Sequence, residues 1–205
     1  MDWIPLFEEK RDRYQRSLVA QGNTAYAAGL ALLMAGDPRS SEWLRRAAAR
    51  WRESWDAGAP SDAWGRPIGA LKASLLAGDE VALEALAPWT LELGTATAES
   101  PIGRYAAVLA LFVLGRWPEG RHVAESLRSR DDFPADVADA LAYIAAHDPV
   151  AYVEAVEAVV RSFETREEFL EDMKVADTAL VLAELARRRG IEMPLPESSV
   201  IPRPA

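Results

Sequence analysis

A short turn sequence recurs along the chain, and it constrains the fold more than any other feature. It reads LMAGDP at 33–38 and LLAGDE at 75–80, and it returns more loosely as VLGRWP at 113–118 and IAAHDP at 144–149. In each copy apolar residues are followed by Gly, or by a residue in its place, and then by Asp or Pro. This order is typical of a joint where one helix ends and another begins.

The chemistry of the turn explains why these residue types recur. Gly36 and Gly78 can adopt the left-handed backbone conformation that closes a helix without a Cβ clash. Three aspartates are expected to accept hydrogen bonds from the first free N–H groups of the next helix: Asp37, Asp79 and Asp148. Two prolines are expected at the first helical position, where the missing N–H costs nothing: Pro38 and Pro149.

The spacing of the joints indicates the architecture. Gly36, Gly78, Gly115 and His147 occupy the equivalent position, at intervals of 42, 37 and 32 residues. Each interval has room for two helices and two short turns. The arrangement resembles tetratricopeptide-like arrays of helical hairpins, although the period drifts. The sequence therefore predicts an all-α fold of stacked antiparallel helical hairpins, in a single domain that covers residues 1–205.

Hydrophobic periodicity predicts about ten helices, and no segment shows the alternation of a β-strand between turn signals. The expected helices span residues 3–20, 24–35, 39–57, 62–77, 79–93, 102–115, 118–130, 134–146, 149–165 and 173–189. From about residue 191 the chain contains four prolines and cannot be helical. This tail is expected to run extended and to pack through Ile191, Leu195 and Ile201.

Composition excludes several classes of protein. The chain has no cysteine, which excludes disulfides, zinc–thiolate sites and thiol catalysis. The charged N-terminus does not match a signal peptide, and the longest apolar run, at 106–115, is about half of the ~20 residues that cross a bilayer. A cytoplasmic protein is expected. A net charge of −9 disfavours nucleic acid and anionic membranes as partners and favours a basic protein.

The residues that carry catalysis in most enzymes are scarce or scattered. The chain has two histidines, of which His147 lies in a turn. His122 completes a Glu119-x-x-His122 spacing, which occurs in di-iron bundles, but the further glutamates that such a site needs are not evident. No serine lies in a nucleophile motif and no glycine loop suits a phosphate. We expect no catalytic residue, no metal site and no cofactor, and therefore no enzyme.

Two features are possible contact surfaces. Trp43, Trp51 and Trp55 fall on one expected helix, where they either fill gaps between helices or line a groove. The densest acidic stretch, ETREEFLED, is either a solvated helix end or a docking surface for a basic partner, and its carboxylates are Glu164, Glu167, Glu168, Glu171 and Asp172. The Phe169–Leu170 pair within it either anchors the stretch or forms the apolar centre of an interface.

The C-terminal part of the chain resembles a known family. It reads VADTALVLAELARRRGIEMPLPESSVIP at 175–202: an apolar helix with "AL-x-x-L-A", then arginines, then Gly-Ile and an extended segment that ends on Ile-Pro. The stretch LAYIAAHDPVAYVEAVEAVV at 141–160 has an Asp, two residues and then an aromatic residue that begins a helix. These features resemble the all-α immunity protein 49 family of bacterial polymorphic toxin systems.

The resemblance implies a non-catalytic immunity protein that binds and neutralises a cognate toxin. Its partner would be a basic toxin domain, and the five carboxylates of the acidic stretch would provide the contact. The alternative is a tetratricopeptide-like adaptor or scaffold that holds a peptide in its concave groove. An adaptor would show a lined groove across several hairpins, whereas an immunity protein would use a convex surface or an edge. The oligomeric state stays open.

Overall fold

The structure is a computed structural model that describes residues 3–203, and this part of the chain is helical without any β-strand. Nine α-helices and two short 3₁₀ helices lie within these residues. In chain order they are α1 (Trp3–Met34), α2 (Ser40–Asp56), α3 (Gly65–Ala77), α4 (Glu80–Glu92), η1 (Thr95–Thr97), α5 (Pro101–Val113), α6 (Trp117–Arg128), α7 (Ala135–Ala146), α8 (Pro149–Thr165), η2 (Leu170–Asp172) and α9 (Asp177–Arg188). The predicted all-α class is confirmed.

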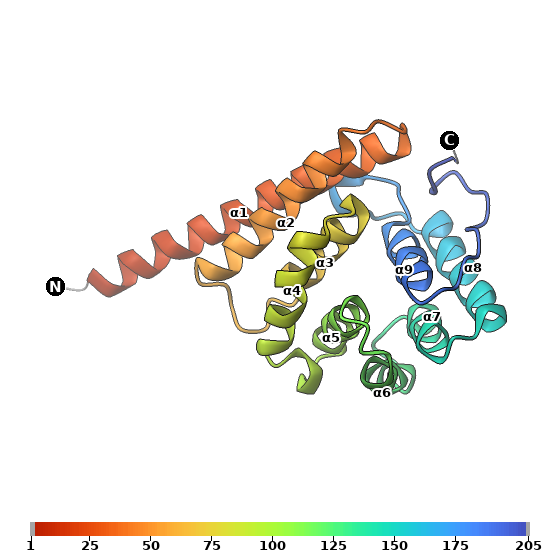
Figure 1. The fold of residues 1–205 in the computed structure, drawn as a ribbon. Coiled ribbons are helices and arrows are strands. Elements are labelled where there is room, and N and C mark those ends of the chain that lie inside the picture. Colours follow the sequence, from red (N-terminus) through yellow and green to blue (C-terminus); the bar gives the residue numbers. More distant parts are fainter. Residues whose placement is uncertain (1–2, 204–205) are drawn as a thin grey trace.

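Consecutive helices from α1 to α8 pack against one another, as short connections between hairpins require (Figure 1). They follow a curve, and α9 lies on its inner side in contact with α3, α5, α7 and α8. The last helix therefore fills the concave side of the stack. No helix within residues 3–203 has the length and apolarity needed to span a membrane.

The four predicted joints share one geometry. Gly36, Gly78, Gly115 and His147 all have a positive φ, between 57° and 68°. At each joint the following N–H group donates to a carbonyl five residues earlier, for example from Asp79 to Ser74 at 3.0 Å, and this pairs the last carbonyls of the helix. His147 takes the conformation that glycine takes elsewhere.

Two of the three predicted aspartate caps are correct. The side chains of Asp79 and Asp148 each accept a hydrogen bond from a backbone N–H three residues later, at 3.1 Å. At the first joint the prediction is wrong, because α2 begins at Ser40 and Pro38 lies before it. The carboxylate of Asp37 accepts instead from the N–H of Arg39 and pairs with its guanidinium. A local contact in the turn has replaced the cap.

The predicted break between residues 20 and 24 does not exist, since α1 runs without interruption through Gly22. Tertiary packing explains this glycine. The buried indole of Trp51 lies between α1 and α3, and a Cβ on Gly22 or Gly69 would approach its ring atoms to 2.8 Å or 2.6 Å. These two glycines allow the close approach of three helices, and Gly22 is not a helix end.

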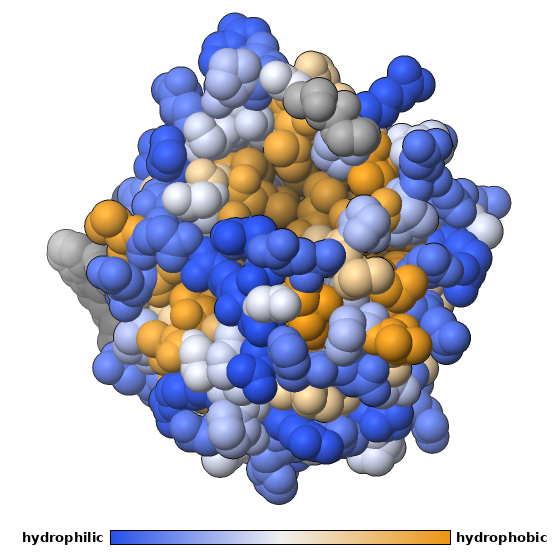
Figure 2. All heavy atoms as spheres, turned by 45° about the vertical axis from the view of Figure 1, so that its right-hand side comes forward, coloured by the Kyte–Doolittle hydropathy of each residue, from blue (hydrophilic) through white to orange (hydrophobic). Residues whose placement is uncertain are grey.

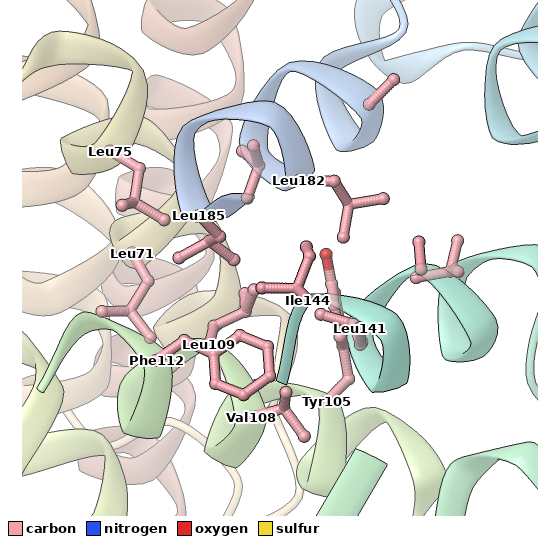
Figure 3. Close-up of a cluster of buried hydrophobic side chains, with 14 of the residues drawn as sticks. Leu71, Leu75, Tyr105, Val108, Leu109, Phe112, Leu141, Ile144, Leu182 and Leu185 are labelled. Atoms are coloured by element: carbon pink, nitrogen blue, oxygen red, sulfur yellow. The ribbon is translucent and has the colours of Figure 1, made fainter. Parts of the chain in front are cut away.

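The core is densest where α9 meets the inner helices. Figure 3 shows leucines of α9 pointing toward side chains of α3, α5 and α7; the labelled residues are Leu71, Leu75, Tyr105, Val108, Leu109, Phe112, Leu141, Ile144, Leu182 and Leu185. All ten are buried. Burying a leucine contributes roughly 1.5–3 kcal/mol, so α9 is an integral part of the fold.

Segments on either side of α9 complete the structure. Residues 173–176, predicted to be helical, lie outside any helix, because α9 begins at Asp177. After α9, Ile191 and Ile201 are buried and Leu195 packs against the core. The chain after Gly190 forms no helix up to residue 203.

Candidate functional site

The acidic segment, residues 164–172, begins in the last turn of α8, ends with η2 and lies on the surface. All five of its carboxylate side chains belong to exposed residues. Within the described part of the chain none of them forms an ion pair, whereas many other acidic residues, such as Glu53, Glu119 and Asp132, bind an arginine. The segment carries five carboxylates and one cation, Arg166, and hence a net charge of −4.

Arg166 does not neutralise these carboxylates, because its guanidinium lies over an aromatic ring. The Cζ atom is 3.5 Å from the ring centroid of Phe163 and 5.9 Å from that of Phe169. Its N–H groups point to the carbonyl and hydroxyl of Ser162 at 3.4 Å. A cation held on an aromatic face is an anchor for the chain. The acidic charge of the segment is left to the solvent or to a partner.

The two apolar residues of the segment have different roles. Phe169 is half-buried, and its ring centroid lies 6.3 Å from that of Phe163. Leu170 has 46% of its surface exposed, although it is among the large apolar residues that folding usually buries. Phe169 therefore anchors the segment, and Leu170 provides an apolar point among the carboxylates.

The backbone of the segment is strained at its end. Glu171 and Asp172 have φ values of 49° and 57°, in the left-handed region that side chains with a Cβ rarely adopt. Such a conformation costs roughly 1–3 kcal/mol per residue and persists only where the surroundings hold it. The N–H of Met173 donates to the carbonyl of Leu170 at 3.0 Å and closes this turn.

A polar cluster anchors the chain directly after the segment. Asp177, the first residue of α9, pairs with Lys72 of α3 at 2.6 Å between Nζ and Oδ2, and both side chains are largely buried. The hydroxyl of Tyr26 on α1 donates to the same oxygen at 2.9 Å. The Lys72 ammonium also donates to Thr178 at 3.1 Å. Three helices are thus joined at the point where the acidic segment ends.

The electrostatics of the Tyr26–Lys72–Asp177 cluster are consistent with its role as an anchor for the chain. Burial, together with the neighbouring Asp177 carboxylate, raises the pKa of Tyr26 well above its ordinary value, so the phenol keeps its proton and can donate it. Sequence reasoning missed this cluster, because Tyr26, Lys72 and Asp177 lie far apart in the chain. The one local signal was an aspartate in the first turn of a helix, which the helix dipole alone would explain.

The C-terminal tail runs beside the segment. The hydroxyl of Ser198 donates to the carboxylate of Glu164 at 2.6 Å, and the N–H of Ala176 donates to the carbonyl of Val200 at 2.8 Å. The first contact is made by the first residue of the segment, and the second lies four residues beyond its last residue. Both ends are therefore fixed, and the exposed carboxylates between them are presented on a loop of defined position.

The structure does not bring together the side chains that the alternative metal site would need. Glu119 binds the guanidinium of Arg116 through both oxygens, and His122 beside it is exposed. In the chain from residue 3 to residue 203, no group of three or more His, Asp or Glu side chains is placed to hold a metal ion.

The tryptophans of α2 pack against neighbouring helices. Trp51 is buried, with its ring centroid 5.2 Å from that of Tyr26. Trp55 is half-buried and stacks on Trp64 at 6.0 Å. Trp43, at the other end of the helix, packs partly buried against the core. The three tryptophans therefore mainly fill gaps between helices, and this accounts for most of their buried surface.

Comparisons with known proteins identify no relative. No protein-family model matches the chain, and neither a curated protein nor a solved structure is significantly similar to it. The resemblance to immunity protein 49 thus stays a prediction from the sequence.

Proposed function

We propose that this protein acts in the bacterial cytoplasm as an immunity protein, which binds a basic toxin domain and neutralises it without catalysis. The observation that supports the proposal best is the acidic segment, in which five exposed carboxylates without ion pairs flank the exposed Leu170 in the sequence. Protein contacts commonly have a polar, solvent-accessible rim around a more apolar centre.

Carboxylates that form no ion pair favour fast association with a basic partner. Surface carboxylates that already bind an arginine contribute little to the field that a partner meets, because the two charges cancel within a few ångströms. The segment keeps a net charge of −4 in a protein of net charge −9. Such a field can raise the association rate with a basic partner by 10- to 1000-fold, on the order of magnitude known for steered complexes.

A fixed loop lowers the cost of binding. Ordering a mobile side chain or loop at an interface costs about 0.5–1.5 kcal/mol for each immobilised side chain. Here the Lys72–Asp177 pair, the Glu164–Ser198 hydrogen bond and the stacked Arg166 hold the segment in place. The turn at Glu171 and Asp172 is closed by two backbone hydrogen bonds, from Asp172 N–H to the carbonyl of Phe169 at 3.3 Å and from Met173 N–H to that of Leu170 at 3.0 Å.

An adaptor is the second possibility, and one surface favours it. A hollow of about 660 Å³ is lined mainly by apolar side chains of α1, α3, α9 and the tail, including Leu33, Leu76, Leu180 and Met193. Figure 2 shows an apolar hollow on the side of the molecule where the C-terminal tail lies. However, a peptide groove across several hairpins would need the inner face of the curve, which α9 occupies.

Co-expression tests the proposal. Each gene that neighbours the gene for this protein would be expressed alone and together with it, and bacterial growth would be measured. We expect one neighbour to arrest growth alone and to be tolerated when this protein is present in a stable complex. If no neighbour is toxic, or if a toxic one is not relieved, the immunity function is wrong.

Charge reversal tests the surface separately. Glu167→Lys with Glu168→Lys is expected to lower the association rate at least about tenfold at low salt, and less at 0.15 M, where screening acts beyond roughly 8 Å. The matched control is Glu84→Lys with Glu92→Lys, which makes the same charge change at exposed residues of α4. Equal rates for the two double variants would exclude the acidic segment and leave immunity itself untouched.

A further inference from the structure

A cleft of about 430 Å³ opens between α1 and α3, and of the acidic segment only Leu170 belongs to its lining. Its volume falls within the roughly 300–1,000 Å³ that is usual for small-molecule sites. Apolar side chains form much of its wall: Val19, Trp51, Ile68 and Leu170. The cleft is referred to here as the Trp51 cleft.

The rigid floor of the cleft is the indole of Trp51. Its ring is fixed by close packing on Gly22 and Gly69, and its Nε1–H donates to Asn23 Oδ1 at 3.2 Å. Because this indole is only 5% exposed, it forms the floor of the cleft. The more exposed apolar walls, Val19, Ile68 and Leu170, are the surfaces that an apolar group can contact.

The polar groups of the cleft are unusual because donors are in excess. The acceptor oxygen of Asn23 is used by Trp51, and Asp177 Oδ2 is used by both Lys72 and Tyr26. In contrast, the amide N–H₂ of Asn23 has no acceptor within the described residues. An excess of free donors suits a ligand that brings acceptors.

Arg66 strengthens the preference of the cleft for a ligand that carries hydrogen-bond acceptors. Its guanidinium is half-buried and donates to the hydroxyl of Ser54 at 2.8 Å and to the side-chain oxygen of Gln15, both of which are neutral. No carboxylate in the described chain lies within ion-pair distance of it. Desolvation lowers the pKa of Arg66, and the carboxylate of Asp12, which lies beyond ion-pair distance and accepts from Gln15, opposes this shift.

The charge of the cleft follows from its four ionisable groups, of which Tyr26 is neutral because its pKa is raised well above its ordinary value. Arg66 and Lys72 are cationic and Asp177 is anionic, which leaves one positive charge in a protein whose net charge is −9. We propose that the Trp51 cleft binds a small monocarboxylate with an apolar body, whose carboxylate pairs with Arg66 and Asn23 while its body packs between Val19, Ile68 and Leu170 above the Trp51 floor. Leu170 belongs both to this cleft and to the proposed toxin contact, but ligand binding can be measured on the isolated protein and does not depend on a toxin.

Phenylacetate is a suitable probe, because it carries one carboxylate on an aromatic body. We would titrate it into the full-length protein labelled with ¹⁵N and follow the indole N–H signal of Trp51 by NMR. The expected result is a saturable shift at millimolar concentrations or below. Phenylacetamide, which has the same body without the charge, should bind at least about tenfold more weakly.

Two variants locate the site. Arg66→Gln should weaken phenylacetate binding at least about tenfold, because a charge-assisted pair is lost. The matched control, Arg121→Gln, removes an exposed arginine of α6 that forms no ion pair among the described residues, and it should bind as the wild type does. Ala63→Trp should block the mouth of the cleft and abolish binding while it leaves Arg66 in place.

Any of three results would overturn the proposal: a Trp51 signal that does not respond to phenylacetate, equal binding of phenylacetate and phenylacetamide, or equal loss in Arg66→Gln and Arg121→Gln. If Arg66→Gln proves unfolded by circular dichroism, Ala63→Trp decides the matter. Binding that persists in a folded Ala63→Trp protein refutes the site.

Discussion

Removing the charge of Lys72 should destabilise the protein far more than removing a surface cation. In Lys72→Met the apolar stem is kept and the ammonium is lost. Asp177 would then be left with the hydroxyl of Tyr26, 2.9 Å from Oδ2, and without its cationic partner. An uncompensated carboxylate in a largely buried site is among the most costly defects that a single substitution can create.

The structure sets the size of the effect. The Lys72 and Asp177 side chains are 12% and 16% exposed, and their charged atoms are 2.6 Å apart. Breaking a fully buried pair costs roughly 3–5 kcal/mol, so a pair with slight access to water should cost about 2–4 kcal/mol. Replacing both residues, as Lys72→Met with Asp177→Asn, removes both charges and keeps an acceptor for Tyr26. The double variant should therefore be more stable than Lys72→Met alone.

Urea unfolding at neutral pH, followed by circular dichroism, measures the difference. A slope of about 2–3 kcal/mol per molar urea converts 2–4 kcal/mol into a fall of about 1 M in the midpoint. Arg130→Met is the matched control, since it breaks an exposed pair with Asp132 and should leave the midpoint unchanged within error. If Lys72→Met shifts the midpoint no more than this control, the pair does not hold α9 against α3.

Two further outcomes follow from packing and from burial. Gly69→Ala should lower the free energy of unfolding by about 1–2 kcal/mol, because the clash of the new Cβ with Trp51 costs more than the gain in helix propensity. In the control Gly65→Ala, the new Cβ meets open space and should cost nothing. A stabilised Gly69→Ala protein would contradict this packing. Burial raises the pKa of Tyr105 and Tyr152 above the ordinary value of 10.0, so the folded state holds these protons more tightly and stability should fall as the pH rises above about 10. Absorbance of the ionised phenols and circular dichroism should change together, and full ionisation of the phenols in a folded protein would refute this expectation.

Part of the candidate site was predictable from the sequence, because charge density and exposure are local properties. Five carboxylates within nine residues are too costly to bury, so their place on the surface follows from composition alone. Which of two apolar neighbours would be exposed was open: the ring of Phe169 packs against that of Phe163, and Leu170 is exposed. That choice depends on where the chain after α8 turns back toward the ring of Phe163.

The sequence by itself determined the joints of the fold. A glycine followed by aspartate ends one helix and starts the next through hydrogen bonds that span only a few residues, so Gly78 with Asp79 could be placed without the rest of the chain. Only the tertiary structure decided that Gly22 continues a helix, that α9 fills the inner side of the curve, and that Lys72 meets Asp177. These features depend on contacts between residues that are distant in the chain. Their energies come from close packing and desolvation, which cannot be predicted from a local sequence pattern.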